Sequence, residues 1–281
     1  MFHREEFSSI LIHNFTNQEM INYYFEKGYD LGEVQACEYQ KLKDVYSSYD
    51  SDEEFIYAQL YSYASKIVDY LKEEYKDFLS EKDILILDEL VQKEKNRIVI
   101  VKPENSTTKV NGHTSFSYAK RKNGSIYFSP EVMDLPNSVD QCLAMESTMI
   151  HEICHLLSSS KDKNHMLDLE IQGEKFSFKN MLGKWFDEGV IEKTAMDLAL
   201  SKHLYANPSL SYFKYVRYVE LVLKQLGMHY TGEIFDRAYD EVLLSVGEDV
   251  LEDYKQYERD LQYQILAKQM KSEMRDDFLK R

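Results

Sequence analysis

A short stretch of β-type sequence has helical patterns on both sides of it, which limits the chain to folds that combine many helices with a small sheet. Arg97–Val101 is a β-branched run closed by Lys102-Pro103, which predicts a strand. Lys122-Asn123-Gly124 predicts a hairpin turn, because Asn-Gly tolerates the positive φ angles of a tight turn, and Ser125–Phe128 is then the return strand. The sequence therefore predicts an α+β fold that is mostly helical and holds one small sheet.

Helical patterns account for most of the remaining residues. Asn17 and Asp52 are candidate N-caps, and the apolar residues from Phe55 to Leu71 recur at helical spacing. A capping-box pattern at Ser138–Gln141 opens a helix that ends near the serines at 158–160. Later helices are expected near Phe186–His203, Tyr212–Leu226, Glu233–Val246 and Asp249–Lys280. We therefore divide the chain into a helical N-terminal region (1–95), a core (96–205) and a helical C-terminal region (206–281).

The charge balance argues against some classes of partner. Asp and Glu number 49 against 34 Lys and Arg, so the formal net charge is −15. An acidic surface disfavours nucleic acid and anionic membranes as partners, although such a charge also serves plain solubility. The three cysteines, Cys37, Cys142 and Cys154, show no spacing pattern, which argues against a disulfide framework.

No segment has the pattern of a targeting or membrane-spanning sequence. Acidic residues follow Arg4 near the N-terminus, and no long apolar run follows them, unlike in a secretory signal. No stretch approaches the roughly 20 apolar residues that cross a bilayer. We therefore expect a cytoplasmic protein without a membrane span, and export by a non-classical route stays open.

The segment His151–His155 has the pattern HExxH and carries the main chemical signal of the sequence. Histidines at i and i+4 share one face of a helix, with Cβ atoms about 6 Å apart, so both imidazoles can reach one tetrahedral zinc ion. Glu152 is placed to act as the general base that takes a proton from an attacking water. The alternative is a pair of core histidines on an amphipathic helix, in which a buried Glu152 would need some other partner.

A zinc site also needs a third protein ligand and an open position for water. The downstream candidates are His165, Glu170, Glu174, Asp187, Glu188 and Glu192. Glu188 and Glu192 are the best of these, because they lie at i and i+4 on one expected helix and share a face. We predict that Glu188 binds the ion and that Glu192 hydrogen-bonds the other nitrogen of a ligand histidine and fixes its tautomer.

An HExxH segment followed by a helix that reads Asp-Glu-Gly-x-x-Glu at 187–192 resembles the gluzincin metallopeptidases. The resemblance covers about residues 97–205, and the spacing of 33 positions from His155 to Glu188 (188 − 155) makes it more similar to small bacterial gluzincin-like proteins. It implies a zincin-like fold with the small sheet packed on the HExxH helix. The roles it implies are zinc ligation by His151, His155 and Glu188, general base catalysis by Glu152, and support of the ligands by Glu192.

Features of related groups are missing. After His155 the chain continues Leu156-Leu-Ser-Ser-Ser160, without the third histidine of metzincins, and the Gly-rich signature of the aminopeptidases is absent. Endopeptidase action is therefore the expectation.

Further residues have expected roles beside the metal site. Tyr215 is our first choice for a group that stabilises the oxyanion. Ser125–Phe128 is expected to be an edge strand that pairs with extended substrate. Cys154 lies on the opposite helix face and is expected to be a buried structural thiol.

The sequence thus predicts a metallopeptidase that uses one zinc ion on a protein or peptide substrate. Two alternatives stay open. The long helical flanks also suit a zinc-binding regulatory or toxin-like protein of narrow specificity, without general protease activity. A helical interaction protein with an accidental HExxH segment would bind no zinc.

Overall fold

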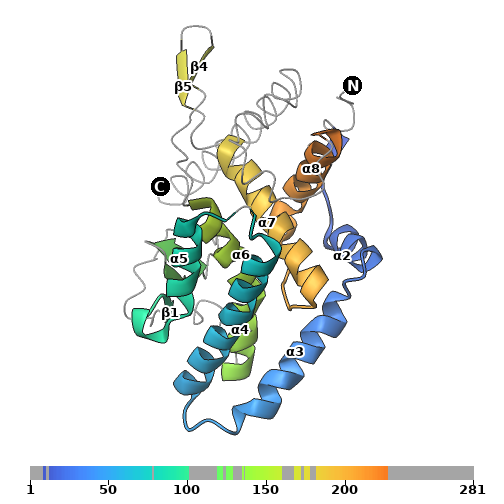
Figure 1. Ribbon diagram of the computed structural model, residues 1–281. Coiled ribbons are helices and arrows are strands. Elements are labelled where there is room, and N and C mark those ends of the chain that lie inside the picture. Colours follow the sequence, from blue (N-terminus) through green and yellow to red (C-terminus); the bar gives the residue numbers. More distant parts are fainter. Residues whose placement is uncertain are drawn as a thin grey trace, which may run out of the picture. The chain divides into compact units, whose positions relative to one another are not determined.

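The computed structural model describes residues 9–10, 13–77, 79–100, 119–122, 125–128, 135, 137–159, 168–171, 174–177 and 182–226 (Figure 1). Its helices are α2 (Asn17–Glu26), α3 (Leu31–Tyr46), α4 (Asp52–Glu74), α5 (Glu81–Val91), the 3₁₀ turn η1 (Lys93–Lys95), α6 (Ser138–Ser159), α7 (Leu182–Lys202) and α8 (Leu210–Leu226). Its strands are β1 (Ile98–Ile100), β2 (Ala119–Lys122), β3 (Ser125–Phe128), β4 (Asp168–Ile171) and β5 (Glu174–Ser177). The described chain is therefore mostly helical with little sheet, as predicted.

Some expected elements differ or cannot be compared. The helices predicted at Glu233–Val246 and Asp249–Lys280 lie outside the described residues. Helix α7 begins at Leu182, four residues before the expected start at Phe186, and α8 closely matches its expected range. The antiparallel pair β4–β5 was not predicted from the sequence, although Gly173 between its strands is a turn signal.

Two helices begin with a cap one residue earlier than predicted. The Thr16 side chain accepts a hydrogen bond from the Glu19 N–H at the start of α2, so Thr16 is the N-cap and Asn17 is the first helical residue. Ser51 in the same way precedes Asp52 at the start of α4. In both pairs either residue type can cap, and the one with the extended backbone does so. The predictions of Asn17 and Asp52 as caps are therefore wrong.

The larger sheet has the order β1–β3–β2. Lys122 pairs with Ser125, which leaves two connecting residues and confirms the predicted hairpin. Strand β3 also pairs in parallel with β1, with Ile98 opposite Ile126. Because β3 has a hydrogen-bonded neighbour on each side, it has no open edge to which a substrate strand could add. The prediction that Ser125–Phe128 is an edge strand is therefore wrong.

Helix α6 lies at the centre of the described packing. It contacts α3, α4 and α5, and it also contacts β2 and β3, so the small sheet packs against this helix. Helix α4 lies along α6 (Figure 1) and presents the apolar face that the spacing from Phe55 to Leu71 predicts. The members of this face that are at most 1% exposed are Phe55, Leu60, Ala64, Ile67, Val68 and Leu71. Each large apolar side chain buried in this way contributes about 1.5–3 kcal/mol, which holds α6 firmly in place.

The chain forms two compact units. One comprises Thr16–Lys163 with Ile191–Leu210, and it contains α2 to α6 and the three-stranded sheet. The other comprises Met1–Phe15, Asn164–Val190 and Ser211–Arg281, and it contains the β4–β5 pair and nearly all of α8. The division falls inside α7, after Val190, so one unbroken helix contributes residues to both units.

None of the helices in the described residues combines the length and the apolar character that crossing a membrane requires.

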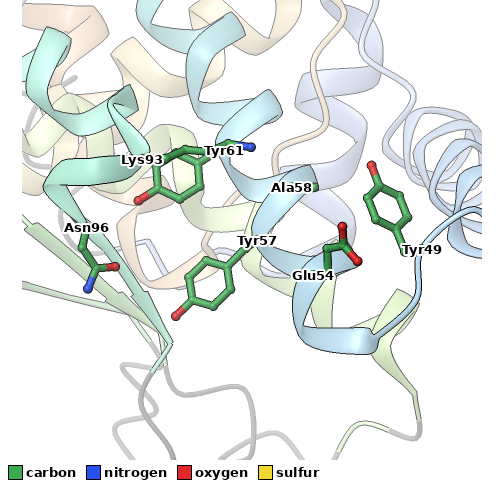
Figure 2. Close-up of a pocket in the computed structure, with 7 residues that line it drawn as sticks. All are labelled: Tyr49, Glu54, Tyr57, Ala58, Tyr61, Lys93 and Asn96. Carbon is green, nitrogen blue, oxygen red and sulfur yellow. The ribbon is translucent and has the colours of Figure 1, made fainter.

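A cavity of about 590 Å³ opens beside α4, and the HExxH residues do not line it (Figure 2). Three tyrosine rings form much of its wall, together with one acidic and one basic side chain. Its lining residues are Tyr49, Glu54, Tyr57, Ala58, Tyr61, Lys93 and Asn96. The cavity is therefore separate from the chemistry that the sequence predicts.

Burial of the Tyr29 hydroxyl makes the free energy of unfolding depend on pH in the alkaline range. Burial raises the pKa of Tyr29 to about 12, and the hydrogen bond with the Ala206 backbone opposes this increase. A group whose pKa is raised on folding contributes stability below its unfolded pKa of about 10 and loses it as pH rises through its folded pKa. We expect the free energy of unfolding to fall between pH 10 and 12, with a smaller fall in Tyr29→Phe. Urea unfolding at several pH values measures this, and an equal fall in both proteins would contradict it.

Candidate metal centre

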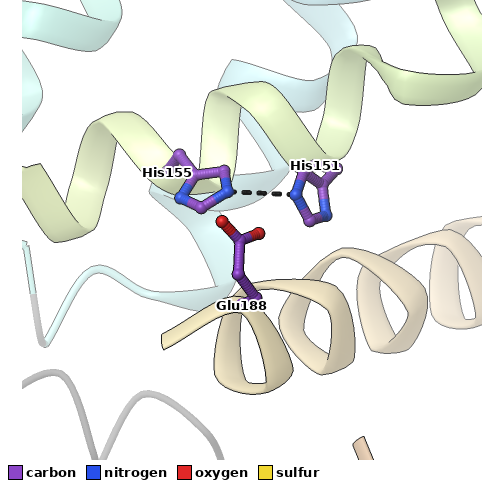
Figure 3. A group of neighbouring side chains, drawn as sticks. All are labelled: His151, His155 and Glu188. Atoms are coloured by element: carbon purple, nitrogen blue, oxygen red, sulfur yellow. Dashed lines mark hydrogen bonds between the residues drawn. The ribbon is translucent and has the colours of Figure 1, made fainter. Parts of the chain in front are cut away.

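The two histidines of the HExxH segment lie on one face of α6. This helix is capped by Asn137, whose side-chain oxygen accepts a hydrogen bond from the Asp140 N–H, so the capping box predicted at Ser138 is wrong by one residue. One turn separates His151 from His155, and their ring centroids are 4.6 Å apart. The two Nε2 atoms face each other at 3.0 Å (Figure 3).

A buried carboxylate fixes the orientation of the first ring. Nδ1 of His151 lies 2.7 Å from Oε2 of Glu192, whose side chain is 5% exposed. A carboxylate oxygen accepts, so Nδ1 carries the proton in this pair and Nε2 presents its lone pair. The predicted contact of Glu192 with a histidine of the HExxH segment is thus present, and that histidine is His151.

Glu188 lies one turn before Glu192 on the same unbroken helix. Helix α7 runs from Leu182 to Lys202, so the position of Glu192 against His151 also directs Glu188 toward α6. Potential ligand atoms of His151, His155 and Glu188 all lie within 4.8 Å of one another, and we call these three residues the ligand cluster. Figure 3 shows the Glu188 carboxylate directed at the two rings. Within the described residues, this is the one group of three or more such side chains close enough to hold a metal ion.

The donor atoms of the ligand cluster fit a divalent metal ion. Two nitrogens bound at 2.0–2.1 Å to a tetrahedral ion lie about 3.3 Å apart, close to the separation of the two facing Nε2 atoms. Two imidazole nitrogens and one carboxylate oxygen are a donor set that binds such ions. His155 and Glu188 are 2% and 7% exposed, so the donors lie inside the protein. Buried polar groups that converge in this way favour binding of a cation.

Glu152 lies next to the first histidine on α6 and is partly buried. One of its carboxylate oxygens is shielded from solvent.

Cys154 lies two residues after Glu152 on α6 and is fully buried. Burial raises the pKa of its thiol well above the usual value. The prediction of a buried Cys154 thiol is confirmed.

The other candidates cannot be compared with the ligand cluster. His165 and the side chains of Glu170, Glu174 and Asp187 lie outside what the structure describes. Tyr215 is 4% exposed and lies on α8, and its proposed contact with the oxyanion stays a prediction.

Gly189 allows the backbone of α8 to approach α7 directly beside Glu188. A Cβ atom at this position would lie 2.8 Å from the Tyr215 Cβ and 2.9 Å from the Tyr215 carbonyl carbon and oxygen. Carbon atoms do not approach so closely without displacement of the backbone. The glycine of the Asp-Glu-Gly segment is therefore required by packing.

The sequence interpretation missed one contact of the site and one buried carboxyl elsewhere on α6. The backbone N–H of Ser209 donates to Oε1 of Glu192 at 2.6 Å, and a backbone amide leaves no signal in a sequence. Glu146 is buried on α6 at 2% exposure, and burial raises the pKa of its carboxyl well above the usual value, with nearby Glu38 adding to the effect. Its place among apolar helix positions could have indicated a core carboxyl.

Comparison of the chain with models of known protein families, with curated proteins and with solved structures finds no match.

Replacement of Gly189 by alanine is expected to destabilise the protein, although alanine is the better helix former. Alanine gains about 1 kcal/mol of helix propensity, whereas forcing a methyl group into a packed contact costs about 1–3 kcal/mol. We expect Gly189→Ala to lower the free energy of unfolding, measured by urea denaturation. Gly32→Ala is the control, because a Cβ there meets only an Asp30 side-chain oxygen, at 3.4 Å. A Gly189→Ala protein as stable as Gly32→Ala would contradict the α7–α8 contact.

Proposed function

We propose that this protein is a zinc-dependent metallopeptidase of the gluzincin type. His151, His155 and Glu188 would hold one zinc ion, and Glu152 would be the general base. The observation that carries the proposal is the convergence of two imidazoles and one buried carboxylate, with a second carboxylate behind His151. Three protein ligands leave one position of a tetrahedral ion open, which is the arrangement of catalytic zinc sites.

Zinc bound at such a site polarises a carbonyl group and increases the acidity of water. The protein's own residues then supply the proton transfers and the orientation. Glu152 takes the proton from the attacking water and delivers it to the leaving amine as the peptide bond breaks. Glu192 holds His151 in the tautomer whose Nε2 faces the ligand cluster. Tyr215 is the proposed donor to the oxyanion.

The arrangement of the fold supports a zincin-like assignment. The small sheet packs on the helix that carries His151 and His155, and α7 presents the third carboxylate to that helix. The substrate would be a protein or peptide, and without an exopeptidase signature we propose cleavage within the chain. The net charge of −15 disfavours nucleic acid as a partner.

Replacement of Glu152 by glutamine should separate metal binding from catalysis. We expect Glu152→Gln to keep one zinc ion per chain and to slow cleavage by about 10²- to 10⁴-fold, the usual contribution of a general base. Zinc content is measured by elemental analysis and cleavage with a peptide library. Glu146→Gln is the matched control, because it makes the same change on α6 at a buried carboxyl whose pKa burial raises. Unchanged cleavage by Glu152→Gln would exclude it as the base.

The same measurements distinguish the proposal from its alternatives. Bound zinc without cleavage of any library peptide would indicate a regulatory or toxin-like protein of narrow specificity. A wild-type chain that binds no zinc would leave a helical interaction protein.

Replacement of Glu188 by alanine tests the third ligand. We expect Glu188→Ala to weaken zinc binding by more than about 100-fold, beyond the 10- to 100-fold loss typical of residues that only support ligands. Asp187→Ala is the control, since it removes the adjacent carboxylate. Competition with a chromophoric chelator measures both affinities. The reverse order of the two effects would show that Glu188 is the wrong ligand.

A further inference from the structure

The connection between α7 and α8, residues 203–209, is held by hydrogen bonds from other parts of the chain. Helix α7 ends where His203 adopts a left-handed conformation with φ of 52°, which turns the chain out of the helix. The Tyr29 hydroxyl, between α2 and α3, accepts from the Ala206 N–H at 2.8 Å. The same hydroxyl lies 3.0 Å from the Leu204 carbonyl oxygen and 2.9 Å from that of Ala206, to which it can donate.

Two further bonds hold the middle of the connection. The Tyr63 hydroxyl of α4 donates to the Tyr205 carbonyl. The Asn207 N–H donates to the Ser147 carbonyl of α6 at 3.1 Å. Tyr29 and Tyr63 are each 2% exposed, so these bonds are shielded from water. Buried backbone groups require such partners, and therefore the hydroxyls determine where the connection lies.

The end of the connection reaches the residue that orients His151. Pro208 is buried and has a fixed φ, which restricts movement between Asn207 and Ser209. The Ser209 N–H then donates to Oε1 of Glu192, while Oε2 of the same carboxylate bonds to Nδ1 of His151. Glu192 is thus held between one backbone amide and one imidazole.

All of these groups belong to one compact unit, which comprises Thr16–Lys163 and Ile191–Leu210. The bonds form a continuous path from Tyr29 and Tyr63 through residues 204–209 to Glu192 and His151. A simple role in stability would explain why the two hydroxyls are buried and bonded. It would not explain why the segment that they hold ends on the carboxylate behind His151.

We infer that Tyr29 and Tyr63 are positioning residues for the metal centre. Their hydroxyls hold residues 204–206 so that the Ser209 N–H meets Glu192, and Glu192 keeps the His151 ring in the orientation that binds metal. This role rests on the proposed metal site. It also gives the N-terminal helical region a function, because Tyr29 and Tyr63 both come from that region.

The test compares metal binding by Tyr29→Phe and Tyr63→Phe with metal binding by Tyr61→Phe. Each change removes one buried hydroxyl, and Tyr61 lies on α4 like Tyr63 but does not bond to the connection in the described structure. The probe is Co²⁺, whose affinity and visible absorption spectrum both report the geometry of the ligands. We expect Tyr29→Phe and Tyr63→Phe to weaken Co²⁺ binding by about 3- to 10-fold, less than the 10- to 100-fold loss for a direct partner of a ligand. Their spectra should shift, and the Tyr61→Phe spectrum should not.

A double-mutant cycle separates positioning from general stability. Combined with Glu192→Gln, Tyr63→Phe should cause little additional loss of Co²⁺ affinity, because both changes act through one carboxylate. Circular dichroism verifies that each variant is folded, and if one of the two tyrosine variants does not fold, the other decides the test alone. Wild-type affinity and spectrum in both Tyr29→Phe and Tyr63→Phe, or losses that add to that of Glu192→Gln, would overturn the inference while the metal centre stands. A wild-type protein that binds no Co²⁺ and no Zn²⁺ would overturn both.

Discussion

The hydrogen bond between His151 and Glu192 sets the geometry of the site. It joins α6 to α7 at one point, with Nδ1 of the imidazole 2.7 Å from a carboxylate that is almost fully buried. A helix is stiff over one turn, so this contact also determines where Glu188 lies. The bond orients the ring and directs Nε2 toward Nε2 of His155, 3.0 Å away. The convergence of the ligand cluster therefore follows from one polar contact and the stiffness of two helices.

Apolar packing holds α6, which carries His151, in place. Helix α6 contacts α3, α4, α5 and the three-stranded sheet, and its inward residues are nearly inaccessible to water. Buried polar groups destabilise the fold unless they are hydrogen-bonded. Here several of them bond one to the next along a single path. The Tyr29 and Tyr63 hydroxyls bond to the α7–α8 connection, which in turn donates to Glu192. Two side chains of the N-terminal helical region are thus connected, through residues 204–209, to the carboxylate that orients His151.

Several local features could be predicted from the sequence. The helical face of α4, the two-residue hairpin between β2 and β3, and the shared face of His151 and His155 all follow from local periodicity and turn chemistry. The errors arose where two neighbouring residues could serve equally well, as at Thr16 and Asn17, because the backbone conformation selects the cap. The strand Ser125–Phe128 was placed at an edge for a different reason. Its pairing with β1 connects residues far apart in the chain, and local patterns contain no information about such pairing.

Spacing along the chain is enough to show which side chains share a helix face, because α-helical geometry depends only on that spacing. It thereby defined the His151–His155 pair and the Glu188–Glu192 pair separately. Packing of the whole chain brings these two pairs face to face, places Glu192 against His151, and lets Ser209 hold Glu192 from the other side. These relations depend on how apolar faces pack and on where buried backbone groups find partners. Both are properties of the whole fold, and the spacing of residues within one segment does not encode them.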